Sequence, residues 1–293
     1  MRRWCSIAKA TALEILSEPL SLLLLVAALA LATLAPAFHY HQFGEATRMA
    51  RDAGFSALFT CGILVSVFGA IKSFRREIET GTAQMALSHP ISRTGFFLSK
   101  VMGAAMAGAF FATVVLATLL TIVNGAAIGG ALAAEKGDLA KLWGPSLAIG
   151  VGTIILPLIL GALLNRFLRC RFVLTFFVCA LAMSLGGACY RIDLHLAWRL
   201  APVAVLILVM VATFLTIASA AAVRFKVNGA AAVVGVMFAL CLPAVGNYYL
   251  PDALAKGGHL AWSYVGLAAL SAFPLALAFL LLGICFFNGK DVG

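Results

Sequence analysis

The distribution of charged residues constrains this chain more than any other feature of its sequence. Eight windows contain no Asp, Glu, Lys or Arg, and they cover residues 19–44, 53–71, 101–134, 142–165, 172–190, 200–223, 227–251 and 257–289. Every window holds at least 19 residues, and a bilayer core about 30 Å thick is crossed by about 20 apolar residues in a helix. Because a helix satisfies its own backbone hydrogen bonds in lipid, we expect one membrane helix in each window.

Composition supports the membrane assignment. The 293 residues are 63% hydrophobic and 11% charged, whereas a soluble domain carries about 25% charged residues. A transmembrane β-barrel needs short strands of alternating polarity, and runs such as residues 21–26 do not alternate. The predicted fold is therefore an all-α, polytopic helical membrane protein with about eight transmembrane helices.

The predicted domain organisation has two parts. Residues 1–18 form an interfacial amphipathic helix that Pro19 ends, since Trp4, Ile7, Ala8, Thr11 and Ile15 share one helical face among charged neighbours. Residues 19–293 form a single transmembrane domain, with spans near 20–38, 54–72, 98–124, 145–165, 172–190, 201–222, 228–246 and 263–287. The third window is longer than a bilayer, so its helix is expected to tilt or break near Asn124.

The positions of Lys and Arg predict the orientation. With the N-terminus in the cytoplasm, 14 of these residues lie on the cytoplasmic side and 7 on the outer side. This asymmetry favours a multi-pass protein with both termini cytoplasmic. It also accounts for most of the formal charge of +10, through contact with membrane lipids, so we expect no nucleic-acid partner.

The windows lack the groups that ion-driven or catalytic chemistry needs. Their centres contain no ionisable residue, which disfavours a proton-coupled carrier, an ion pump or a voltage sensor. The chain has no Gly-x-x-x-x-Gly-Lys-[Ser/Thr] loop and no Cys-x-x-Cys pair. His39 and His41 lack further ligands nearby in sequence. We therefore predict no metal site, no catalytic residue and no enzyme activity in this chain itself.

The connection between the second and third spans holds the most specific pattern. Charges alternate densely over residues 72–79 and then give way to an apolar-polar segment. Gly81 can end the helix that leaves the membrane, and Thr82 can cap a short helix over residues 83–88 that Pro90 stops. Ser92 or Thr94 can then cap the third span. A short exposed helix flanked by charges suits docking onto a soluble partner.

This connection resembles the signature of the type-2 exporter permeases of ATP-binding-cassette (ABC) transporters. The likeness covers roughly residues 72–103 and rests on Glu-x-Glu-x-Gly-Thr at 77–82, Pro-x-Ser-Arg at 90–93 and a lysine at the start of the next span. It implies a cytoplasmic coupling-helix loop over 75–95 that sits in a groove of a separate ATPase subunit, and it likens residues 1–18 to the family's elbow helix. By this resemblance the ATPase-coupling positions are Glu77, Glu79, Gly81, Thr82, Pro90 and Arg93.

The resemblance also implies a function and partners. The chain would be the permease subunit of an ATP-driven exporter in the plasma (bacterial inner) membrane, paired with a second permease subunit, identical or homologous, and with two ATPase copies. The chain would carry no cofactor, because ATP and Mg would be bound by the ATPase. Spans whose interiors hold only Ser, Thr and Asn as polar residues suit a lipid-like or apolar cargo better than an ion.

Alternatives stay open at this stage. The family typically has six spans, so the extra windows are either a real C-terminal extension or spans read too generously, including a re-entrant segment near residues 242–251. A membrane carrier or scaffold that needs no ATPase is the alternative from another class. A third hypothesis is an ABC complex that transmits force to a periplasmic partner.

Overall fold

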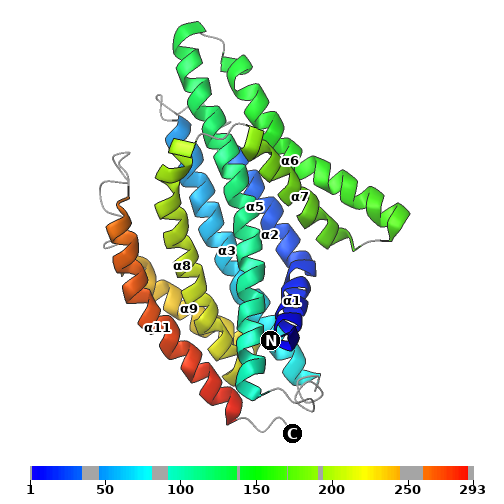
Figure 1. Cartoon of the computed structure of the whole chain (residues 1–293), viewed down its shortest axis with the longest axis vertical. Helices are drawn as coiled ribbons and strands as arrows, with labels where there is room; N and C mark the ends of the chain where they lie inside the picture. The colour runs from blue at the N-terminus through cyan, green and yellow to red at the C-terminus, as the bar shows by residue number, and fades with distance from the viewer. Residues whose placement is uncertain are drawn as a thin grey trace. The chain divides into compact units, whose positions relative to one another are not determined.

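The computed structural model describes residues 2–34, 46–80, 92–136, 139–169, 171–190, 194–244 and 260–289. Within these ranges the regular elements are nine α-helices: α1 (Arg2–Ser17), α2 (Pro19–Leu34), α3 (Ala46–Glu79), α5 (Arg93–Lys136), α6 (Leu139–Leu168), α7 (Phe172–Tyr190), α8 (Leu194–Arg224), α9 (Val227–Ala244) and α11 (Trp262–Asn288). Figure 1 shows them as coloured ribbons. The prediction of an all-α fold is confirmed.

Six stretches of helix are long and apolar enough to cross a membrane. Among the described residues they are Ala50–Glu79, Arg93–Asn124, Gly150–Phe167, Phe172–Cys189, Ala197–Arg224 and Trp262–Asn288. The bent pair of α1 and α2 makes a seventh if it counts as one broken span, and the apolar stretch Val227–Ala239 of α9 is shorter. These helices fit a multi-pass membrane protein. Six of the predicted windows thus hold a helix of spanning length, while the count of eight stays a prediction.

Several helices extend beyond their predicted spans. The chain between α3 and α5 covers only residues 80–92, so both ends of the predicted 75–95 loop are helical. α5 runs without interruption for 44 residues, so the expected alternative of a break near Asn124 is wrong, while the alternative of a tilt stays a prediction. The side chain of Asn124 is buried, and an asparagine lowers helix propensity by at most about 0.7 kcal/mol. Exposing unpaired backbone groups in lipid would cost several times more.

The contacts of the chain divide it into two compact units, a subdivision that the sequence does not reveal. Unit 1 comprises Met1–Ile15, Ile63–Ala109 and Val205–Gly293, and unit 2 comprises Leu16–Gly62 and Phe110–Ala204. Each unit is assembled from segments far apart in sequence. The long helices α3 and α5 contribute to both, because the boundary between the units falls after Gly62 in α3 and after Ala109 in α5.

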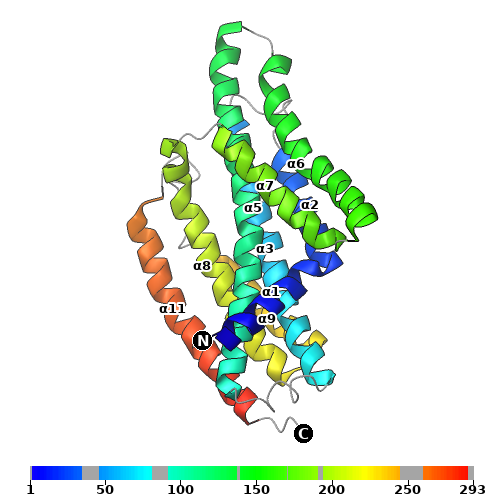
Figure 2. The same ribbon diagram turned by 45° about the vertical axis from the view of Figure 1, so that its right-hand side comes forward.

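The core of unit 1 is aromatic. Phe97 of α5 is fully buried, and its ring centroid lies 5.3 Å from that of Phe74 in α3 and 6.2 Å from that of Phe287 in α11. A Cβ added at Gly283 would lie 2.6 Å from Cζ of Phe97 and 3.3 Å from Cα of Ala220. This close approach seats α11 against α5 and α8, and Figures 1 and 2 show α8 and α11 running side by side.

Unit 2 is organised around the hairpin of α6 and α7, which lie side by side in both views (Figures 1 and 2). A Cβ added at Gly161 would lie 3.2 Å from the ring of Phe172. Phe177 is fully buried, with its ring centroid 6.2 Å from that of Phe110 in α5. A Cβ at Gly150 would lie 2.5 Å from Thr33, so α2 and α6 also meet closely.

Candidate functional site

The N-terminal helix α1 provides one wall of the candidate site. Its buried residues recur at helical spacing, and they are Ala8, Thr11, Ala12, Ile15 and Leu16. Glycines on α3 and α5 face this stripe: a Cβ at Gly69 would lie 2.6 Å from Ile15, and one at Gly103 would lie 2.5 Å from the carbonyl oxygen of Ala8. Because glycine has no side chain, the backbone of α5 can approach α1 closely.

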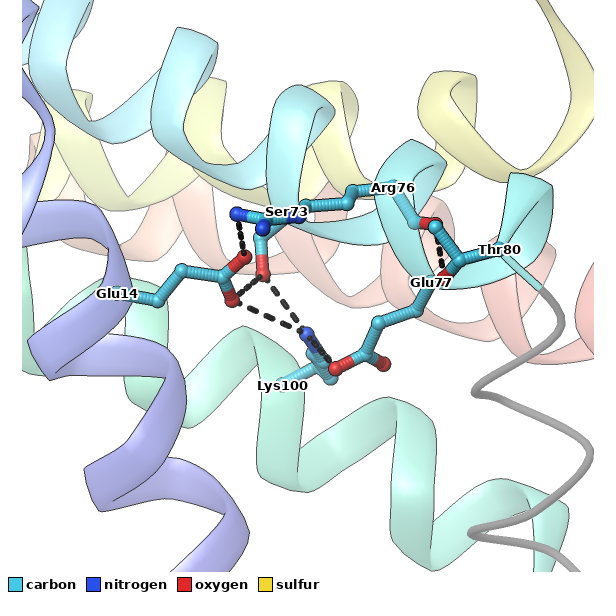
Figure 3. Close-up of polar contacts among 6 residues, drawn as sticks. All are labelled: Glu14, Ser73, Arg76, Glu77, Thr80 and Lys100. Atoms are coloured by element: carbon cyan, nitrogen blue, oxygen red, sulfur yellow. Dashed lines mark hydrogen bonds and ion pairs between the residues drawn. The ribbon is translucent and has the colours of Figure 1, made fainter.

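Lys100 lies at the centre of the polar contacts that join these helices. It is the eighth residue of α5, and its side chain is 1% exposed. Its Nζ atom lies 2.6 Å from Oε1 of Glu77, donates to Oγ of Ser73 at 2.7 Å and lies 3.8 Å from Oε2 of Glu14 (Figure 3). A buried ammonium is tolerated only where carboxylates and hydrogen-bond acceptors compensate for its lost hydration.

Glu14 connects α1 to the same cluster. Its Oε2 accepts a hydrogen bond from Oγ of Ser73 at 2.9 Å, and its Oε1 lies 3.6 Å from a guanidinium nitrogen of Arg76. Ser73 therefore accepts from Lys100 and donates to Glu14, and it bridges the two charges. We call Glu14, Ser73, Arg76, Glu77 and Lys100 the Lys100 network. It joins α1, α3 and α5 within unit 1.

Helical spacing explains why α3 can contribute three members. Ser73 and Glu77 are four residues apart and Arg76 is three after Ser73, and such positions lie on adjoining parts of one helix surface. The helix ends just beyond, where both the amide and the hydroxyl of Thr80 donate to the carbonyl oxygen of Arg76. The network therefore occupies the last turns of α3, immediately before the connection to α5.

The predicted coupling residues have different environments. Glu77 belongs to the Lys100 network, and its side chain is 27% exposed. Glu79 is 60% exposed and pairs with Arg75 one turn earlier, with 2.8 Å between their charged atoms. Arg93 is exposed and donates to the carbonyl oxygen of Asn288, at the end of α11, at 3.1 Å. Gly81, Thr82 and Pro90 lie outside the described residues, as do the predicted helix over 83–88 and the histidines at 39 and 41.

The predicted cap of the third span is confirmed at Ser92. The amide of Gly95 donates to Oγ of Ser92 at 3.1 Å, and the amide of Phe96 donates to its carbonyl oxygen at 3.0 Å. This is the geometry of an N-cap, in which a side-chain oxygen satisfies an amide that has no partner in the first turn. Ser92 therefore defines the point at which the chain re-enters a helix after the connection.

Sequence reasoning did not assign Glu14, Ser73 or Arg76 to a site, and it named Lys100 only as the lysine at the start of the third span. A signal for Lys100 was present, since a lysine inside an apolar helix of spanning length requires a carboxylate partner. Glu77 and Glu79 were the nearest acidic candidates in sequence. The role of Glu14 had no comparable signal, because only the packing of α1 brings it to the end of α3.

The network is suited to a mechanical role. It contains two carboxylates and two cationic side chains, so its formal charges balance, and its contacts fix three helices to one another. Within the part of the chain that the structure describes, no group of three or more His, Cys, Asp or Glu side chains is placed to hold a metal ion.

Comparison of the chain with protein-family models, curated proteins and solved structures finds no significant match.

Proposed function

We propose that this chain is the transmembrane permease subunit of an ATP-driven ABC transporter of the exporter type, with a lipid-like or apolar cargo. A separate ATPase subunit would dock on the connection after α3 and supply the energy. The chain would sit in the bacterial inner membrane with both termini in the cytoplasm. Two permease subunits, identical or homologous, and two ATPase copies would form the complex.

The observation that carries the proposal is the Lys100 network beside the predicted docking connection. A docked subunit can move membrane helices only if the helices that flank its docking segment respond as a body. On one side of the connection, Glu77 is bound to Lys100 of α5 and, through Ser73, to Glu14 of α1. On the other side, Arg93 is bound to the end of α11. A push on this connection would therefore reach four helices of unit 1.

The polar content of the spans favours an apolar cargo. Thr118, Thr121 and Ser219 are buried, and each hydroxyl donates to the carbonyl oxygen four residues earlier in its own helix. Hydroxyl groups that are bonded in this way are poorly placed to replace the water molecules that surround an ion. The energy for transport would come from ATP bound by the partner, whose closure would favour one packing of the permease pair over another.

The test uses Glu79, which is exposed and, among the described residues, is paired only with Arg75, in an i,i+4 contact that contributes about 0.5 kcal/mol or less. We expect Glu79→Arg to leave folding intact and to abolish both co-purification of an ABC ATPase subunit and the stimulated ATP turnover of that subunit. The matched control is Asp52→Arg, which reverses an exposed acidic residue near the opposite end of the same helix. That variant should retain the ATPase.

Two results would reject the proposal. If Glu79→Arg binds and stimulates the ATPase as the unaltered chain does, the connection after α3 is not the docking site. If the purified chain recovers no ATPase and moves substrate without ATP, the alternative of an ATPase-independent carrier replaces the proposal. An ATPase complex that forms but moves no lipid cargo between leaflets would favour force transmission to a periplasmic partner.

A further inference from the structure

The turn between α6 and α7 carries a concentrated positive charge. Arg166, Arg169 and Arg171 fall within six residues and all three are exposed. No acidic residue occurs anywhere from position 139 to position 192. Among the described residues, none forms an ion pair or side-chain hydrogen bond with these guanidinium groups. The charge of this turn is therefore not neutralised within the part of unit 2 that the structure describes.

The position of this turn brings its charge to the membrane surface. The candidate spans Gly150–Phe167 and Phe172–Cys189 are separated by four residues. The second of these spans is 18 residues long, or about 27 Å as helix, which is close to the thickness of a bilayer core. A connection this short holds all three arginines within a few residues of the boundary between acyl chains and headgroups. Phe167, 78% exposed, lies among them as an apolar side chain suited to that boundary.

The backbone at Arg169 is a second, independent observation. Arg169 has φ 53°, and it is the one non-glycine residue with positive φ in the described ranges. Its amide donates to the carbonyl oxygen of Asn165 at 3.1 Å, so it occupies the left-handed position after a helix end where glycine is usual. A glycine would adopt this conformation without strain. The backbone conformation at position 169 therefore favours glycine over arginine, so it does not explain why an arginine is present there.

We propose that Arg166, Arg169 and Arg171 form a binding surface for the phosphate of an anionic phospholipid, with Phe167 among the acyl chains. A guanidinium presents a fork of N–H donors that matches two phosphate oxygens. Basic residues at the membrane surface attract anionic lipid, and burial of the aromatic ring adds an apolar contribution. The proposal rests on the membrane character of the chain and not on its role in ATP-driven transport.

The experiment compares dioleoyl-phosphatidylglycerol with dioleoyl-phosphatidylcholine, each added in mixed micelles to the purified full chain. Native mass spectrometry counts bound lipids, and thermal unfolding follows stability. We expect phosphatidylglycerol to bind preferentially and to raise the midpoint of unfolding by mass action. Arg166→Gln with Arg171→Gln should weaken this binding by about fivefold for each arginine removed.

Arg169→Gly separates binding from folding. Because glycine suits the left-handed backbone, this variant should unfold in phosphatidylcholine at the same temperature as the unaltered chain or higher. Its affinity for phosphatidylglycerol should nevertheless fall by about fivefold. Weaker lipid binding by Arg169→Gly therefore cannot be attributed to a folding defect, even if the double variant Arg166→Gln with Arg171→Gln folds poorly.

The control is Lys9→Gln with Arg224→Gln, which removes two exposed positive charges elsewhere. If this pair weakens phosphatidylglycerol binding as much as the α6–α7 variants do, the attraction is diffuse and the proposal fails. It also fails if the α6–α7 variants bind the lipid normally, or if inorganic phosphate alone stabilises the chain to the same degree. Loss of a bound protein from the variants, with lipid binding unchanged, would assign the surface to a protein partner and overturn the proposal.

Discussion

The Nζ atom of Lys100 in α5 lies 2.6 Å from the Oε1 atom of Glu77 in α3, and the lysine side chain is 1% exposed. The two residues are 23 positions apart and flank the connection between α3 and α5. A buried ion pair holds its partners together only while both charges are present. The position of the C-terminal end of α3 therefore depends on the N-terminal turns of α5, and the reverse also holds.

Removal of the lysine charge should destabilise unit 1. In Lys100→Met, Glu77 and Glu14 lose a shared counter-ion while Glu77 stays largely buried. We expect a loss of about 3 kcal/mol, the lower end of the range for breaking a buried pair, since both carboxylates keep some exposure. Thermal unfolding in detergent, followed by intrinsic fluorescence, measures the change.

The double variant Lys100→Met with Glu77→Leu is the informative control. It removes both charges and substitutes apolar side chains, which often restores much of the stability lost in the single variant. An unfolding midpoint for Lys100→Met equal to that of the unaltered chain would contradict the proposed dependence.

Close packing of α1 on α5 predicts a second effect. A Cβ at Gly103 would lie 2.5 Å from the carbonyl oxygen of Ala8 and 2.7 Å from Cβ of Thr11, so Gly103→Ala has to displace α1. We expect a cost of about 1 to 3 kcal/mol in the free energy of unfolding. Gly235→Ala is the control, because a Cβ there meets nothing within 4 Å and alanine favours helix. Equal midpoints for the two variants would argue against the contact.

The aromatic core of unit 1 predicts an asymmetry along α11. Phe287 is 1% exposed and lies beside the rings of Phe96 and Phe97, whereas Phe273 is 67% exposed. Phe287→Ala should destabilise the chain by about 3 kcal/mol, because it leaves a cavity. Phe273→Ala, which removes the same atoms from an exposed position on the same helix, should change the unfolding midpoint little. The reverse order would contradict the burial of Phe287 in the core of unit 1.

The N-cap at the start of α5 allows a graded test. Ser92→Ala removes the oxygen that accepts from the amide of Gly95, and the expected loss is about 1 kcal/mol. Ser92→Gly should cost only a few tenths of a kcal/mol, since glycine is tolerated at this position. Hydrogen exchange of the first-turn amides of α5 locates the effect, and unchanged exchange in Ser92→Ala would contradict the cap.

Much of the fold followed from local pattern. The predicted spans near 54–72, 98–124, 145–165, 172–190, 201–222 and 263–287 each correspond to a helix of spanning length, because apolar length is a local property. The cap at Ser92 was predicted for the same reason. Helix ends were less accurate: charged residues continue α3 to Glu79, since a helix that leaves the bilayer can remain helical in the polar region.

The candidate site was only partly predictable. Glu77 was singled out for contact with a partner, yet its side chain is bound to Lys100 inside the chain. Arg93 was grouped with it, and the structure joins Arg93 to the carbonyl oxygen of Asn288, which is 195 positions away. Such pairings depend on which helix ends meet, and helical periodicity carries no information on that.

The amino-acid sequence alone is enough to assign a helical multi-pass membrane protein, because lipid demands long apolar helices and charges would be costly within them. The packing of α1 on α3 and α5, and the arrangement of Glu14, Ser73 and Glu77 around Lys100, follow only from the way the helices come together. The reason is physical: transfer into lipid is governed by each segment separately, whereas an ion pair depends on distance between segments that packing alone brings together.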